Sequence, residues 1–98
     1  MFEVELQSSD RIEPEIVFRV VEQVCASNEL TCSLKGTLTS YPGSVHWHFK
    51  QDKQSGILEI TWWEREHRLW FKVASGRTSE WIIKIIPRLK EQMENLLL

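Results

Sequence analysis

Apolar and polar side chains alternate along four short segments in the middle of this sequence, and turn-forming residues separate the segments. Strict alternation is typical of a strand that buries one face, because successive side chains of a strand point to opposite sides. Short connections between such strands favour antiparallel hairpins. The pattern therefore predicts a four-stranded antiparallel meander, with strands at residues 31–40, 45–50, 57–64 and 68–73.

The three connections have the composition of turns. Pro42-Gly43 fits a type II turn, residues 51–56 form a polar loop, and Arg65-Glu66 makes a tight connection. One pairing in each hairpin places apolar residues opposite apolar residues, which is the condition that sets strand register. These pairings are Glu64 with His67, Phe49 with Leu58 and Ser40 with Val45; they join Leu38, Trp47, Ile60 and Phe71 in one core row and set Gly36 opposite Phe49.

Two segments that flank the meander carry apolar residues at helical spacing. The first helix is predicted to begin at Asp10 or Glu13 and to extend to about Ser27. The second begins after Ser79, a good N-cap, and eight apolar residues fall in one stripe along it. Pro87 is expected to kink this helix about one turn after its start.

A further strand is predicted at residues 2–7, where Phe2, Val4 and Leu6 alternate with polar residues, and its place in the sheet is left open. The sequence contains no repeat and no linker, so we expect one domain that spans residues 1–98. The predicted fold class is α+β. It is a two-layer sandwich in which the N-terminal and C-terminal helices pack on one face of the meander, in the order β-α-β-β-β-β-α.

Charge and cysteine content argue against several classes of protein. A net charge of −2 is unlike that of a nucleic-acid-binding protein, which normally presents a basic face to the phosphates. No apolar run is long enough for a signal peptide or a membrane span, so we expect a cytoplasmic protein without a membrane partner. Cys25 and Cys32 occupy apolar positions seven residues apart, which predicts two reduced, buried thiols.

The second face of the predicted sheet has no helix left to cover it. The register places Trp63 and Trp70 there on a diagonal, close enough to touch, with Arg68 beside Trp63 for a cation–π contact. Tryptophan and arginine dominate interface hot spots, although rings among threonine and basic residues also brace solvated sheets. The candidate interface or ligand-binding residues are Trp63, Trp70, Arg68, Lys72, His46 and His48, and Lys35, Thr37 and Thr39 are predicted on the same face.

His46 and His48 lie two residues apart on one strand, so both side chains point to this second face. The register sets Glu59 beside His48 and Thr61 beside His46. Two imidazoles and a carboxylate are a zinc-binding set, but the sequence does not fix a third strong ligand. We therefore interpret the pair as surface histidines that bond to cross-strand neighbours, and we predict no metal and no cofactor.

A short polar loop leads into the C-terminal helix. Free backbone N–H groups at a helix start attract anions, and Arg77 adds a positive charge there. An ordinary loop with its helix cap has the same composition. The candidate anion site consists of Gly76, Arg77, Thr78 and Ser79.

The sequence shows no serine or cysteine placed against a base and a carboxylate, so we predict a protein that is not an enzyme. The first hypothesis is an interaction module that binds another protein, most simply a second copy of itself in a homodimer, through the open sheet face or an edge strand. The alternative is a protein that binds a small acidic ligand or anion on the sheet face or at Arg77.

Overall fold

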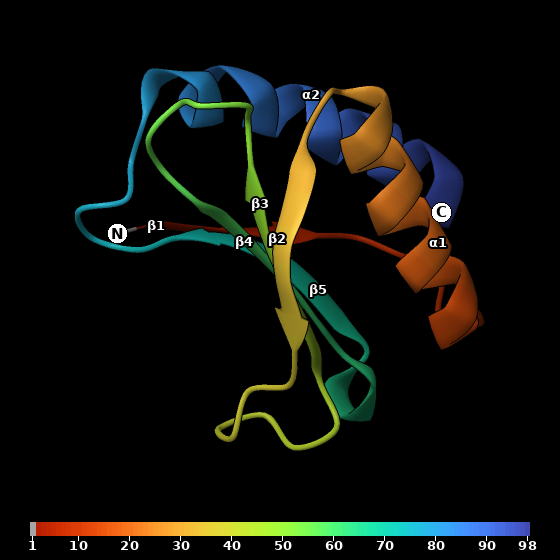
Figure 1. Ribbon diagram of the computed structural model, residues 1–98. Helices are drawn as coiled ribbons and strands as arrows, with labels where there is room; N and C mark the ends of the chain where they lie inside the picture. The colour runs from red at the N-terminus through yellow and green to blue at the C-terminus, as the bar shows by residue number, and fades with distance from the viewer. Residues whose placement is uncertain (1) are drawn as a thin grey trace.

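The computed structural model describes residues 2–98, and these form a five-stranded antiparallel sheet with two α-helices (Figure 1). The order of elements is the predicted β-α-β-β-β-β-α, so the predicted α+β fold is confirmed. A 3₁₀ turn, η1 (Glu64–Glu66), connects the last two strands. The elements are β1 (Phe2–Leu6), α1 (Pro14–Ser27), β2 (Thr31–Gly36), β3 (Val45–Lys50), β4 (Leu58–Trp63), β5 (Arg68–Val73) and α2 (Glu80–Leu97).

The strands lie in the order β1-β5-β4-β3-β2, so the last four form the predicted meander and β1 extends it beyond β5. The sequence had left the place of β1 open. This strand runs antiparallel to β5, with Val4 opposite Phe71 and Leu6 opposite Leu69. Its apolar residues therefore continue the apolar rows of the meander.

Both helices lie on the same side of the sheet, next to each other, and give the two predicted layers (Figure 1). Strand residues that point to this side, such as Trp47, Ile60 and Phe71, are fully buried. α2 continues through Pro87. Within residues 2–98, neither helix has the length and apolar character needed to cross a membrane. The residues that the helices contribute to this core include Val17, Val21, Ile82, Leu89 and Met93.

Two of the three predicted registers are confirmed. Phe49 lies opposite Leu58 in the pairing of β3 with β4. The connection between β4 and β5 is closed by a hydrogen bond of 3.0 Å from the His67 N–H to the Glu64 carbonyl. These two registers place the side chains of β3, β4 and β5 on the faces that the sequence predicted.

The predicted register of β2 against β3 is wrong. β2 ends at Gly36, which lies opposite His46, and the register shifts between Cys32 and Leu34. Residues 37–44, which include Thr37 and Thr39, form a loop instead of continuing the strand. The predicted pairs that do not form are Ser40 with Val45, Leu38 with Trp47 and Gly36 with Phe49.

Hydrogen bonds inside this loop explain why the strand stops early. The buried hydroxyl of Ser44 accepts the N–H of Leu38 at 3.1 Å, and the N–H of Ser44 donates to the Tyr41 carbonyl at 3.0 Å. Backbone groups that a longer strand would have paired are therefore satisfied within the loop. The Pro42-Gly43 turn lies inside the loop and does not set the hairpin register.

Lys35 takes the place opposite Trp47 that was predicted for Leu38, so its side chain points to the helices and not to the second face. The Lys35 ammonium lies 2.6 Å from Glu22 Oε2 and 5.9 Å from the ring centroids of Phe18 and Trp47. Apolar pairing did not predict this, because the stem of a lysine covers apolar surface while its charged end reaches a carboxylate.

The two cysteines differ in environment. Cys25 on α1 is buried, as predicted, whereas Cys32 is exposed and the prediction for it is wrong. Cys32 belongs to β2, an edge strand whose six residues are all exposed. Burial raises the pKa of the Cys25 thiol, with smaller contributions from Cys32 and Glu22, so Cys25 stays protonated at neutral pH.

Removal of the Glu22 carboxylate is expected to destabilise the fold. Glu22 Oε2 accepts the Trp47 indole N–H at 2.9 Å, and Trp47 is fully buried. Glu22→Ala leaves that donor unpaired, so the free energy of unfolding should fall by about 1–3 kcal/mol in urea denaturation. Lys35→Met keeps an apolar stem over Phe18 and Trp47 and removes only the exposed charge, so it should cost about 0–1 kcal/mol. Equal losses in the two variants would contradict this assignment.

The same contact predicts a loss of stability in acid. The hydrogen bond from Lys35 lowers the pKa of Glu22; burial opposes it, and the Trp47 indole and the Lys35 charge reinforce it. Because the folded pKa lies below that of the unfolded chain, this contribution is present above the ordinary value of 4.5 and is lost as the pH falls through the folded pKa. Urea midpoints should therefore decline less toward acid pH in Glu22→Gln than in the wild type, and parallel declines would contradict the prediction.

Candidate functional site

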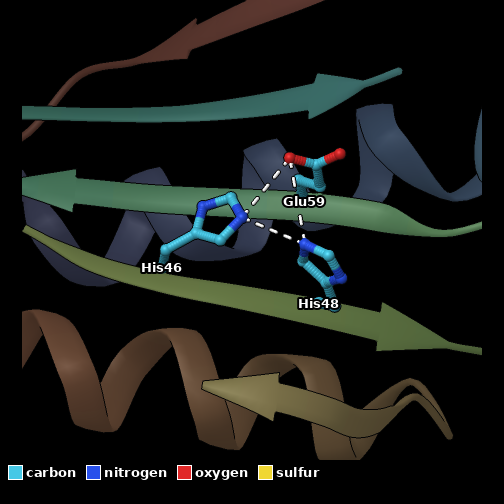
Figure 2. A group of neighbouring side chains, drawn as sticks. All are labelled: His46, His48 and Glu59. Atoms are coloured by element: carbon cyan, nitrogen blue, oxygen red, sulfur yellow. Dashed lines mark hydrogen bonds and ion pairs between the residues drawn. The ribbon is translucent and has the colours of Figure 1, made fainter. Parts of the chain in front are cut away.

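The second face of the sheet carries all six predicted interface or ligand-binding residues. Figure 2 views this face, with the helices behind the strands, and shows His46 and His48 on β3 beside Glu59 on β4. Because side chains alternate along a strand, every second residue of β4 and β5 joins them. The additional residues on this face are Thr61, Trp63, Arg68, Trp70 and Lys72.

The centre of this face is buried, although in the described chain no helix lies over it. His46 is 4% exposed, Glu59 9%, Thr61 1% and Trp70 3%. An ionisable pair at such depth is costly unless each group is compensated by a partner. His46 and Glu59 therefore need compensating contacts.

Three potential ligand atoms converge at this centre. His46 Nε2 lies 3.3 Å from Glu59 Oε1 and 3.1 Å from His48 Nε2, and His48 Nε2 lies 4.0 Å from the same carboxylate oxygen (Figure 2). The register produces this arrangement, since β3 and β4 pair His48 with Glu59 and His46 with Thr61. The carboxylate that the sequence placed beside His48 is thus the third member of the group.

The dimensions of this triangle match those of a metal site. A point equidistant from the three atoms lies about 2.1 Å from each, as the three separations require. Zinc binds imidazole nitrogen at about 2.0–2.1 Å and carboxylate oxygen at about 2.0–2.2 Å. His46, His48 and Glu59 could therefore hold one ion with little rearrangement.

Thr61 fixes the orientation of the His46 ring. Its hydroxyl lies 2.7 Å from His46 Nδ1, and both residues are buried. When Nδ1 carries the proton and donates to this hydroxyl, Nε2 presents its lone pair to the triangle. Metal-ligating histidines are commonly held in this way by a second hydrogen bond.

The protonation of His46 favours the same arrangement. Burial lowers the pKa of His46; the Glu59 charge opposes this, and His48 and Lys72 add to the lowering. His46 is therefore neutral at pH 7 and retains a lone pair. The ring nitrogen that faces the Glu59 carboxylate oxygen at 3.3 Å donates to it when Nε2 carries the proton, and presents a lone pair when Nδ1 does. A cation at the centre of the triangle would select the second form, because it binds the Nε2 lone pair.

Arg77 brings the predicted anion loop to the same place. Its Nη1 lies 3.8 Å from Glu59 Oε2, the oxygen that does not face the histidines. The candidate histidine face and the candidate Arg77 loop thus meet at one carboxylate, although residue spacing did not predict that they would meet. Ser79, the predicted cap, does occupy the N-cap of α2, but its side chain makes no capping hydrogen bond.

Gly56 positions this loop against the sheet. A Cβ at Gly56 would lie 2.7 Å from Ser79 Cβ and 2.9 Å from the Arg77 carbonyl oxygen, and its φ of +98° also favours glycine. The neighbouring Ile57 N–H donates to the same carbonyl at 3.1 Å. The loop before β4 and the loop before α2 are therefore packed together, which holds Arg77 near Glu59.

The tryptophans form a second group at another part of the face. Tyr41, from the loop that was predicted as a turn, packs edge-on against Trp63 and Trp70 at centroid distances of 5.0 and 5.1 Å. The Trp63 indole donates to the Pro42 carbonyl at 2.9 Å. Both rings therefore have intramolecular partners, and Tyr41 is a member of this group that alternation along strands does not detect.

Arg68 contacts a different tryptophan from the predicted one. Its guanidinium lies over the Trp70 ring at 4.5 Å, and not over Trp63. It also donates to both carboxylate oxygens of Glu5 on β1, at 3.2 and 2.8 Å. Glu5, the partner on β1, explains why Arg68 contacts the other tryptophan, because the position of β1 was not known from the sequence.

Comparison with known proteins gives no assignment: no protein family, no curated protein sequence and no solved structure matches this chain.

Proposed function

We propose that this protein is a non-enzymatic binding module that holds one divalent transition-metal ion, of the zinc class, on His46, His48 and Glu59. The observation that carries the proposal is the convergence of two Nε2 atoms and one carboxylate oxygen with separations of 3.1, 3.3 and 4.0 Å. The three residues come from two adjacent strands of the sheet, which makes the arrangement rigid.

The donor set selects the metal. Imidazole nitrogen suits zinc, copper, nickel and iron, whereas magnesium and calcium prefer oxygen ligands. Two histidines with one carboxylate leave at least one position of a tetrahedral ion open. We propose binding and not catalysis, because Glu59, the carboxylate in the cluster, serves as a ligand and is not free to act as a general base.

Zinc titration of the metal-free protein should give one ion per chain in isothermal calorimetry. We expect His46→Gln and His48→Gln each to weaken binding at least about 100-fold, and Thr61→Val about 10-fold through the lost support of His46. His67→Asn is the matched control, because His67 bonds to the Ser9 carbonyl outside the cluster and asparagine tolerates its left-handed backbone.

Unfolding measurements give an independent readout of the same site. Free zinc at 100 times its dissociation constant should add about 2.7 kcal/mol to the free energy of unfolding. At the same zinc concentration the stabilisation should fall to about 0.4 kcal/mol or less in His46→Gln and remain in His67→Asn. Equal zinc affinity in the wild type and in a His46→Gln, His48→Gln double variant would contradict the proposed site.

A second candidate function is self-association through β2. This strand forms one edge of the sheet, all six of its residues are exposed, and Leu34 on it is 47% exposed. An exposed edge offers unpaired backbone groups to a neighbouring chain, and two copies related by a twofold axis satisfy one another. We prefer the edge to the tryptophan face, because Trp70 is already buried within one chain.

Sedimentation equilibrium tests this second candidate. Leu34→Asp should shift a concentration-dependent dimer to monomer, because it places a charge at the centre of the paired edges. Ile83→Asp is the matched control, since Ile83 is 50% exposed but belongs to α2 and not to the edge strand. A wild type that remains monomeric at high concentration would refute self-association and leave the metal site unaffected.

A further inference from the structure

Glu59 divides its two oxygens between different partners. Oε1 faces both histidines, and Oε2 faces Arg77 at 3.8 Å. This distance is too long for a hydrogen bond, and the Arg77 side chain is 46% exposed. Its planar guanidinium, with five N–H donors, is therefore accessible to a further acceptor beside the proposed metal position.

The loaded site would carry an excess of positive charge. A divalent ion and Arg77 together outweigh the single negative charge of Glu59, because imidazole ligands add no charge. Lys72 lies opposite Glu59 across the pairing of β4 with β5, but it also lies opposite Glu3 on β1. The neighbourhood is thus suited to an additional anion.

The Glu59 carboxylate indicates how large an anion must be to reach from the ligand triangle to Arg77. One of its oxygens belongs to the ligand triangle, and the other lies 3.8 Å from Arg77 Nη1. A second carboxylate or phosphate group of similar size would span the same gap. Arginine binds such groups through two parallel N–H···O bonds, which lysine cannot reproduce.

We propose that the open coordination position takes an oxyanion, the carboxylate or phosphate group of a small acidic molecule, with one oxygen on the metal and others on the Arg77 guanidinium. This inference rests on the proposed metal site and names the class of ligand that the site accepts. It assigns to Arg77 a ligand-binding role in which it does not touch the metal.

Cobalt-loaded protein tests the inference with acetate and methyl phosphate as probes. Entry of an oxygen ligand into the coordination sphere of cobalt should change its visible absorption in a saturable way. Arg77→Gln should weaken the apparent anion affinity about 10-fold, the effect of losing a charge-assisted hydrogen bond, whereas cobalt affinity should not fall, because the charge that is removed repels the cation. Arg77→Lys, which keeps the charge, should fall between the two.

Arg19→Gln is the matched control, because it removes the same charge from an exposed position on α1, on the other side of the sheet. The relative response to acetate and methyl phosphate shows which oxyanion the site prefers.

If cobalt binds but neither anion changes its spectrum, or if Arg77→Gln behaves as Arg19→Gln does, the oxyanion inference is overturned and the metal site stands. If no cobalt binds, the metal proposal fails as well. Equal anion affinity of the metal-free protein, measured by isothermal calorimetry, would also overturn the inference.

Discussion

The pairing of β3 with β4 determines both the core and the polar cluster. On the helix side it sets Trp47 opposite Ile60 in the buried row, and on the other side it sets His48 opposite Glu59. A slip of one residue would move every side chain to the opposite face, exposing the apolar row and burying the histidines against the helices. The register that stabilises the fold is therefore also the register that brings the ligand atoms together.

The central polar residues compensate one another within the sheet face. Burial of a carboxylate costs several kcal/mol of hydration unless partners compensate it, and Glu59 has His46 at 3.3 Å, Arg77 at 3.8 Å and His48 at 4.0 Å as partners. A cation bound at the proposed position would contact both histidines and the carboxylate at once.

Residue spacing predicted the helices, the order of elements, two registers and the neighbours of His46 and His48, because these depend on local periodicity and on pairing of adjacent strands. Residue spacing failed on the edge strand β2 and in the loops. Lys35 was misplaced because its stem substitutes for an apolar residue, and Tyr41 was missed because loop residues follow no period. The contact of Arg77 with Glu59 depends on how two loops pack around Gly56, and such long-range packing leaves no signal in residue spacing.

Long-range proton–nitrogen NMR of the three histidine rings, with and without zinc, reports which ring nitrogens hold the metal. Zinc should shift Nε2 of His46 and His48 to the values of metal-bound nitrogen, leave the proton of His46 on Nδ1 toward Thr61, and leave the His67 ring unchanged. Zinc-bound signals from Nδ1 of His46, or histidine spectra that zinc leaves unaltered, would contradict the claim that these two strands form a metal site.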